Sequence, residues 1–358
     1  MRGMTKRGKI LLGAGAVPLL IMLYLFAWPV PIEPIAWEAP VFNPDDWKTT
    51  GTLATAERIE LPSGHGPEDI EVDSQGRIYA GLDDGRILRW DAVDKEPVVF
   101  ADTGGRPLGL DWDQSGRLLV ADGVAGVLAI DVDGKIEVLA TECGEQPLGL
   151  ADDLAAAADG SIWFSDASQR FGLREWKHDF FESKPNGRLC VWEPATKKTR
   201  EVLGDMYFAN GIAVDPGQEF VLVTESSRYR VRRVWIAGAR TGEHEVIIDN
   251  LPGIPDGIST GSNGIFWIAI ASPRDPFIDE MAGSPWIRKM VFRLPAFVHP
   301  APKRTARIIG IDRDGKVVHD LFDPKAERIW MVTSVQERAG DLYLGSAADH
   351  AWARIPVP

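Results

Sequence analysis

Cysteine is scarce in this chain, with only Cys143 and Cys190 among 358 residues. Two cysteines so far apart exclude a disulfide-dense scaffold and a zinc site of the usual paired spacing. Two interpretations stay open for them. They form one disulfide if the protein faces an oxidising compartment, or they are small buried hydrophobic side chains beside strands.

Positive charge is in deficit. The chain has 39 Lys and Arg residues against 52 Asp and Glu residues, so its formal net charge is −13. This balance argues against a nucleic-acid partner, because phosphates need a basic surface. An acidic surface suits a soluble domain and is compatible with cation binding.

Two common catalytic features are not supported by the sequence. Gly257–Gly261 reads Gly-x-Ser-x-Gly, but it lies within an expected blade strand and not at the strand-to-helix turn of a nucleophile elbow. The sequence contains no glycine-rich phosphate-binding loop, so a serine hydrolase and a nucleotide-dependent enzyme are both disfavoured. Glycine (36), proline (25) and tryptophan (13) are plentiful, and 45% of the residues are hydrophobic. These numbers suit a large domain with many turns and broad aromatic packing.

One long apolar run, residues 10–28, follows the basic side chains Arg2, Lys6, Arg7 and Lys9. The run is just long enough to cross a bilayer as a helix. Its basic flank predicts a cytoplasmic N-terminus and a main domain on the periplasmic or lumenal side. A cleaved signal peptide is the alternative, but residues 28–31 offer no small-x-small cleavage site. We therefore predict a basic flank and transmembrane helix over residues 1–30 and a proline-rich tether over 31–51.

A strand-sized phrase returns about six times after residue 60. One copy runs from Gly66 to Val72 and continues through Arg77–Gly81 and Gly85–Trp90, and the next begins at Arg106. Each copy holds three or four short alternating segments separated by Asp and Gly turns. Repeats near 40 residues with several strands each are typical of propeller blades, because one blade cannot bury its faces alone.

We therefore predict an all-β, six-bladed β-propeller over residues 52–358. A strand within residues 52–61 is expected to complete the last blade. Insertions near 169–186 and 273–305 concentrate aromatic and methionine residues, which could wall an apolar pocket, pack onto the propeller or dip into a membrane. The blades are expected to begin near Pro67, Pro107, Pro147, Phe208, Ile254 and Ala306, and the last to end at Ile355.

Four oxygen-bearing side chains stand at comparable points where inner strands begin: Glu68, Asp152, Asn210 and Asp256. Loops from successive blades meet at one end of a propeller channel, so these side chains are expected to converge. Carboxylate and amide oxygens favour calcium, which takes six to eight oxygen ligands. Asp and Asn are also common turn formers, but four positions in register favour a metal site.

The chain resembles the strictosidine synthase-like family over roughly residues 60–358. The resemblance is carried by Gly187–Leu189, Trp192–Pro194, Phe208–Ala213, Thr224–Glu225 and Asn250–Asp256. It implies membership of a wider propeller superfamily that includes paraoxonases and gluconolactonases and holds a channel calcium with Glu, Asn and Asp. By this resemblance Glu68, Asn210 and Asp256 match the expected ligand types. Asp152 stands where many relatives have Asn, and Gly257 where they often have Asn.

One departure from the family separates two functions. True strictosidine synthases, which the chain resembles, carry an essential Glu seven residues before the glycine of a last-blade phrase that here reads Gly340–Gly345. Counting back gives Thr333. Threonine cannot be the acid/base of a Pictet–Spengler condensation, and Glu337 lies four residues away.

Two residues are candidates for proton transfer. His65 precedes Glu68 by three residues and could lie by the channel mouth, and Asp256 could act if the metal binds it loosely. His178 and His350 are weaker candidates. Glu225 and Arg228 are expected to form a buried or cross-blade ion pair with a structural role.

The sequence thus predicts a membrane-anchored, calcium-dependent hydrolase of a small-molecule ester or lactone, similar to arylesterases and lactonases. The cation would act as a Lewis acid in the channel. The alternative is a non-catalytic propeller that binds a ligand or protein, with calcium only structural. A carbon–nitrogen bond-forming synthase is disfavoured by Thr333. Fold alone cannot choose among these.

Overall fold

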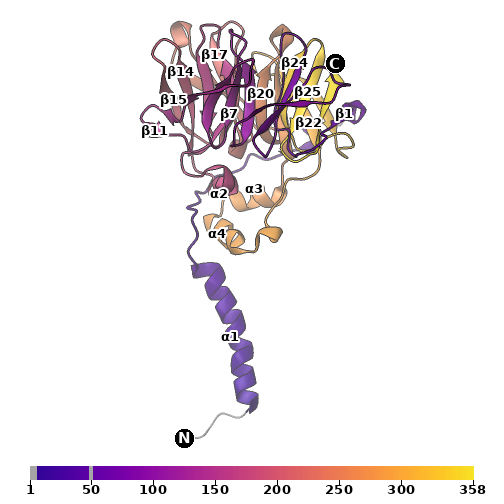
Figure 1. Cartoon of the computed structure of the whole chain (residues 1–358). Coiled ribbons are helices and arrows are strands. Elements are labelled where there is room, and N and C mark those ends of the chain that lie inside the picture. Colours follow the sequence, from indigo (N-terminus) through magenta and orange to yellow (C-terminus); the bar gives the residue numbers. More distant parts are fainter. Residues whose placement is uncertain (1–5, 48–50) are drawn as a thin grey trace.

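The computed structural model describes residues 6–47 and 51–358. In these residues, six four-stranded antiparallel sheets stand around a central channel as the blades of a β-propeller (Figure 1). The predicted six-bladed propeller is confirmed. Alternating strands with tight Asp/Gly turns explain the form, since each sheet is apolar on both faces and must be covered by its neighbours.

The strands of the first five blades follow chain order from the channel outwards. Blade one contains β2 (Ile70–Val72), β3 (Ile78–Gly81), β4 (Arg86–Trp90) and β5 (Val98–Asp102); blade two contains β6 (Pro107–Trp112), β7 (Leu118–Asp122), β8 (Gly126–Ile130) and β9 (Ile136–Ala140); blade three contains β12 (Ala151–Ala156), β13 (Ile162–Asp166), β14 (Gly187–Glu193) and β15 (Lys198–Met206); blade four contains β16 (Ala209–Val214), β17 (Phe220–Glu225), β18 (Arg230–Trp235) and β19 (His244–Ile248); and blade five contains β20 (Gly253–Thr260), β21 (Phe266–Pro273), β22 (Ala306–Ile311) and β23 (Val317–Asp323). A small hairpin, β10 (Glu142–Cys143) with β11 (Gln146–Pro147), precedes blade three.

The sixth blade joins the two ends of the domain. It contains β24 (Val332–Arg338), β25 (Asp341–Ser346), β26 (Ala351–Pro356) and, on its outer edge, β1 (Glu57–Glu60). Glu57 lies opposite Arg354, and Glu60 lies opposite Ala351. This pairing is the closure expected of a strand within residues 52–61.

The start of blade six differs from the prediction. Strands β22 and β23 are the outer strands of blade five, so blade six begins at Val332 rather than at Ala306. The long insertion lies inside blade five, between its second and third strands. In the sequence, the apolar strand after that insertion therefore looks like the start of a new blade.

The connections within blades three and five carry the helices near the channel mouth. In blade three, η3 (Leu173–Glu175) and α2 (Trp176–Glu182) lie between β13 and β14. In blade five, α3 (Pro276–Ala282), α4 (Pro285–Arg293) and η7 (Ala296–Val298) lie between β21 and β22. Figure 1 shows α2, α3 and α4 together between the propeller and the N-terminal helix. We call this group of helices the roof.

The N-terminal helix α1 (Lys6–Ala27) contacts the roof with its last turn. The Tyr24 hydroxyl donates to the carbonyl of Arg293, 2.7 Å away, and Phe26 stacks on Trp286 with ring centroids 6.4 Å apart. Among the described residues, no helix combines the length and the apolarity that crossing a membrane requires. The transmembrane helix therefore stays a prediction.

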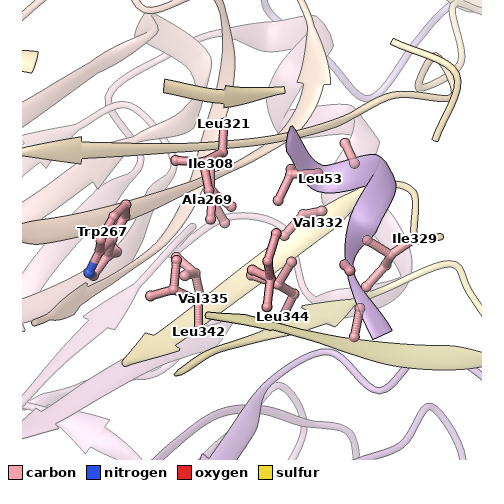
Figure 2. Packing of buried hydrophobic residues seen from close by; sticks show 14 of the residues in the cluster. Leu53, Trp267, Ala269, Ile308, Leu321, Ile329, Val332, Val335, Leu342 and Leu344 are labelled. Atoms are coloured by element: carbon pink, nitrogen blue, oxygen red, sulfur yellow. The ribbon is translucent and has the colours of Figure 1, made fainter. Parts of the chain in front are cut away.

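Short 3₁₀ turns complete the described structure: η1 (Pro44–Asp46), η2 (Thr52–Thr55), η4 (Ser226–Arg228), η5 (Gly238–Arg240) and η6 (Ser262–Gly264). Of these, η2 packs into the seam between blades five and six. Figure 2 shows its Leu53 inserted beside Ile308, Leu321 and Val332, and Leu53 is fully buried. Burying a leucine contributes roughly 1.5–3 kcal/mol, so this contact holds the segment before β1 in place for closure.

The two cysteines form a disulfide. Cys143 in the β10–β11 hairpin is bonded to Cys190 in β14, and their Cα atoms are 6.0 Å apart. Both side chains are buried in the core between blades two and three. Of the two interpretations left open by the sequence, the structure supports the paired one, which suits an oxidising compartment.

Candidate functional site

Each blade places one residue at a common position where its innermost strand begins. In blades two to six this position lies in a β-bulge, and in blade one it lies two residues before β2. A bulge re-aims the side chain at that point. In blade order the six residues are Glu68, Leu108, Asp152, Asn210, Asp256 and Thr333. All except Asp256 line a channel cavity of about 300 Å³.

The three carboxylates at this level lie close enough to influence one another. Burial raises the pKa of Glu68 well above its usual value, and the charges of Asp256 and Asp152 raise it further. Burial and then the Asp256 charge raise the pKa of Asp152 in the same way. The predicted ligands from blades one, three and five therefore share a buried setting that disfavours three free negative charges.

Arg106 is the cation that opposes this repulsion. Its positive charge lowers the pKa values of Glu68 and Asp152. The guanidinium is itself buried and donates to the carbonyl of Gly66, 2.9 Å away. One arginine against three carboxylates leaves the site electronegative.

Asn210 joins the carboxylates through Asp256. Burial raises the pKa of Asp256 to about 7, and a hydrogen bond from the Asn210 side chain opposes the rise. Asp256 keeps more solvent exposure than the other three residues, which are each below a tenth exposed. Its carbonyl accepts from the Thr224 hydroxyl at 2.7 Å. A Cβ on Gly211 would lie 2.5 Å from that carbonyl, so glycine is needed where blades four and five approach.

The donor set suits a hard cation such as calcium. Carboxylate and amide oxygens are its preferred ligands, and a cation would offset the repulsion that raises the carboxylate pKa values. Across residues 6–47 and 51–358, however, no three His, Cys, Asp or Glu side chains are arranged to hold a metal ion. The fit therefore rests on the chemistry of the four side chains, the Asn210 amide included, and not on a preformed cluster of carboxylates.

The next residues along the inner strands fasten the blades to one another, a role that the sequence analysis missed. Asp69 accepts from the backbone N–H of Leu110 at 2.8 Å, linking blades one and two. Asp153 accepts from Ile212 N–H at 2.7 Å, linking blades three and four. An acidic residue directly after Glu68 and directly after Asp152 was the available signal. These bonds hold the ligand-bearing strands at fixed separations.

The structure places His65 away from the channel cavity. Its Nε2 lies 3.1 Å from the carbonyl of Ala348, its Nδ1 lies 3.4 Å from Asp83, and its ring meets His350 edge-on. It does not line the cavity that holds Glu68. A catalytic role for His65 stays a prediction with no channel contact to support it, and His350 shares its location.

Thr333 occupies the sixth equivalent position and is buried. Its hydroxyl donates to the carbonyl of Glu68 at 2.8 Å. Glu337 lies further along β24 and accepts from the Trp267 indole N–H at 2.7 Å. No carboxylate from blade six therefore occupies the common position.

The prediction of an ion pair between Glu225 and Arg228 is wrong. Glu225 instead pairs with Arg230 and Arg232, the latter at 2.8 Å. Arg228 turns towards the roof, where it bonds to Ser183 and stacks on the Tyr207 ring. Tyr229, which has a left-handed backbone conformation, separates Arg228 from the start of β18. The side chain of Arg228 therefore takes a different direction from those of Arg230 and Arg232.

The chain matches two family models, strictosidine synthase over residues 152–239 and strictosidine synthase-like, N-terminal, over residues 45–90. It is 33% identical to a protein named strictosidine synthase-like 13 from Arabidopsis thaliana, with 82% of this chain and 78% of that protein aligned. It is 30% identical to an adipocyte plasma membrane-associated protein from Salmo salar, with 93% of this chain and 86% of that protein aligned.

Solved structures share the fold at low sequence identity. A gluconolactonase from Xanthomonas campestris has a TM-score of 0.62 and 17% identity, over 92% of this chain and 99% of that one. A calcium-binding regucalcin from Agrobacterium tumefaciens has a TM-score of 0.57 and 16% identity, over 83% and 92%. With the propeller, the channel residues and these sequence matches together, the chain belongs to the strictosidine synthase-like family.

Proposed function

We propose that this protein is a calcium-dependent hydrolase of a small-molecule ester or lactone. The proposal is supported by the common position of Glu68, Asp152, Asn210 and Asp256 at the starts of inner strands, where burial raises the carboxylate pKa values and mutual repulsion adds to the rise for Glu68 and Asp152. Clustered titratable groups with perturbed pKa values beside a cavity are typical of functional sites.

Each side chain has a distinct part in this proposal. A bound calcium would supply Lewis acidity, polarising the substrate carbonyl. Glu68, Asp152 and Asn210 are nearly buried and would hold the ion. Asp256 is more exposed and would be the ligand nearest to the substrate and its attacking water. Arg106 limits the negative charge when substrate enters.

Two further points support hydrolysis over condensation. Thr333 cannot pass a proton to and from an amine near neutral pH. Two proteins with the same fold are named as a gluconolactonase and a calcium-binding regucalcin. Neither likeness shows more than the fold, but both are compatible with a calcium-dependent lactonase.

We also propose that α1 anchors the protein in a membrane, with the propeller outside the cytoplasm. Relatives named for the plasma membrane support this location. The basic residues before residue 10 support the orientation. Through the contact of α1 with α4, the roof and the channel mouth would face the bilayer (Figure 1).

The test is a panel of aryl esters and lactones offered to the purified full chain with calcium or with a chelator. We expect hydrolysis of at least one substrate, lost with chelator and restored by calcium. Saturable calcium binding without hydrolysis would favour the non-catalytic propeller. Condensation of tryptamine with an aldehyde, with no hydrolysis, would overturn the proposal.

A further inference from the structure

A second cavity lies between the propeller and the roof, separate from the channel cavity. Its volume is about 120 Å³, and its walls come from α2, α3, α4, the tether and the ends of blade-four and blade-five strands. Apolar side chains form most of these walls, among them Trp37, Phe180, Phe181, Ile278 and Met281. We call it the roof pocket.

Two polar side chains that line the roof pocket each have a buried atom without a hydrogen-bond partner. These atoms are the Ser227 hydroxyl and the Nε–H of Arg288, on residues that are 8% and 3% exposed. An arginine Nε–H can only donate, and a serine hydroxyl can donate as well. A buried donor without a partner is costly, so this pair marks a place for a hydrogen-bond acceptor.

Positive charge is also unbalanced around this pocket. The other guanidinium nitrogens of Arg288 donate to the carbonyls of Phe181, Glu182, Ala282 and Ile35. Arg228 donates to Ser183 and to the carbonyl of Ser227, both at the pocket wall. Among the described residues, neither arginine forms an ion pair with a carboxylate.

Both arginines stay charged near neutral pH. Burial lowers the pKa of Arg228 to about 10, and burial together with the charge of Arg228 lowers the pKa of Arg288 to about 10. Buried charges are normally paired. Asp275, an acidic residue in the pocket wall, is already bonded to Lys303 at 3.0 Å and caps α3.

We propose that the roof pocket binds a small apolar carboxylate, with its charged oxygens on Arg288 and Ser227 and its apolar body against the aromatic walls. The pocket, at about 120 Å³, is somewhat smaller than the cavity of about 150 Å³ that encloses a benzene ring, but it is partly open. It therefore suits a short alkyl acid, or a single-ring acid whose ring extends to the mouth. The inference does not depend on hydrolysis in the channel.

Fluorine NMR of 4-fluorobenzoate with the full chain in lipid nanodiscs tests the proposal. We expect saturable binding, and the neutral isostere 4-fluorobenzamide should bind at least about tenfold more weakly, the size of one charged hydrogen bond. Equal binding of acid and amide, or no saturation by the acid, would overturn the proposal.

Matched serine variants locate the site. Ser227→Ala should weaken benzoate binding about threefold or more, because it removes an unpartnered donor. Ser272→Ala is the control, since the Ser272 hydroxyl lines the same pocket but already accepts from Lys303 N–H at 3.2 Å. Arg288→Gln should weaken binding further, and the serine pair decides the matter if this variant fails to fold. Equal affinities for the two serine variants would contradict the assignment.

Calcium in the channel is the other place where a carboxylate ligand could bind. Benzoate binding should therefore persist in chelator and in the Asp256→Ala variant. Loss of binding under either condition would place the ligand in the channel and refute the roof pocket. If benzoate binding persists but the protein hydrolyses no ester or lactone, the roof pocket is supported and the proposed hydrolase activity is rejected.

Discussion

Thr333 and Glu68 are joined across the seam that closes the propeller. The Thr333 hydroxyl of blade six donates to the Glu68 carbonyl of blade one at 2.8 Å. The residue that replaces the synthase carboxylate thus fixes the backbone of a predicted calcium ligand. This relationship gives the position a role that does not involve proton transfer.

Thr333→Val should lower the free energy of unfolding by about 1–2 kcal/mol, because the buried Glu68 carbonyl loses a donor. Calcium affinity should fall as the Glu68 backbone loosens. Thr333→Glu should not create condensation of tryptamine with an aldehyde and should not improve ester hydrolysis, since it adds a fourth carboxylate. Denaturant unfolding and both activity assays check this. Condensation by Thr333→Glu would show that only this carboxylate separates the two chemistries.

Asp256→Ala should abolish calcium binding and hydrolysis while the β-sheet circular dichroism stays near that of the unaltered chain. The side chain contacts Asn210 but carries no strand pairing, so the blades should remain closed. Calorimetric titration with calcium checks the binding. The control is Asp94→Asn at an exposed turn, which should behave like the unaltered protein. Retained hydrolysis in Asp256→Ala would remove Asp256 from the mechanism.

Replacing Cys143 and Cys190 by serine should lower the free energy of unfolding by about 4 kcal/mol, the loop-entropy value for closing 47 residues. Denaturant melts of the double variant and the parent give the difference. A reducing agent should shift the parent and leave the variant unchanged. Two titratable thiols in the native parent would show that the pair is not bonded.

Asp179 in α2 should make stability depend on pH. It is fully buried, accepts from Ser168 and Asn186 at 2.6 and 2.8 Å, and burial raises its pKa from 3.8 to about 6. The folded state therefore holds its proton more tightly than the unfolded chain. The proton on Asp179 therefore adds to the free energy of unfolding. This stabilisation is fully present below pH 3.8 and is lost as the pH rises through 6, a change of about 3 kcal/mol.

The measurement is the free energy of unfolding at several pH values for the parent and for Asp179→Asn. The variant cannot ionise, so the parent should lose stability relative to it between about pH 4 and pH 6. A constant difference between the two proteins across that range would show that Asp179 ionises at its ordinary pKa in the fold.

The full chain should sediment with membranes, and protease added outside spheroplasts should reach the propeller. Deleting residues 1–28 should release the protein into the soluble fraction, because the propeller closes without α1. A mature protein that begins beyond Ala27 would instead indicate a cleaved signal peptide. Protection of the propeller from protease would reverse the proposed orientation.

The repeating pattern was sufficient to predict the propeller because blade strands and their turns are local features. The boundary of blade six was not local. An insertion of about thirty residues between β21 and β22 breaks the repeat inside a blade, and only strand pairing shows that Ala306 continues blade five. Because blade six was predicted to begin at Ala306 and not at Val332, the sequence analysis did not show that Thr333 is equivalent in position to Glu68, Asp152, Asn210 and Asp256.

The channel residues could be predicted because each stands at the same point of a repeat. Contacts between distant segments could not. The sequence distance between Glu225 and Arg228 suggested an ion pair, yet Arg230 and Arg232 lie on the correct face of β18 to reach Glu225. The sequence likewise placed His65 near Glu68, but it could not show the loop around Ala348 that binds the imidazole.

The pairing of β1 with β26 also has a consequence for synthesis of the chain. The first strand of the domain leaves the ribosome long before its partner, which lies at residues 351–356. Until residues 332–356 have been synthesised, blade six lacks its three inner strands, and Leu53 lacks the side chains of blade six against which it packs. The ring can therefore close only after residues 351–356 have left the ribosome, and a nascent chain would need protection of that open edge until then.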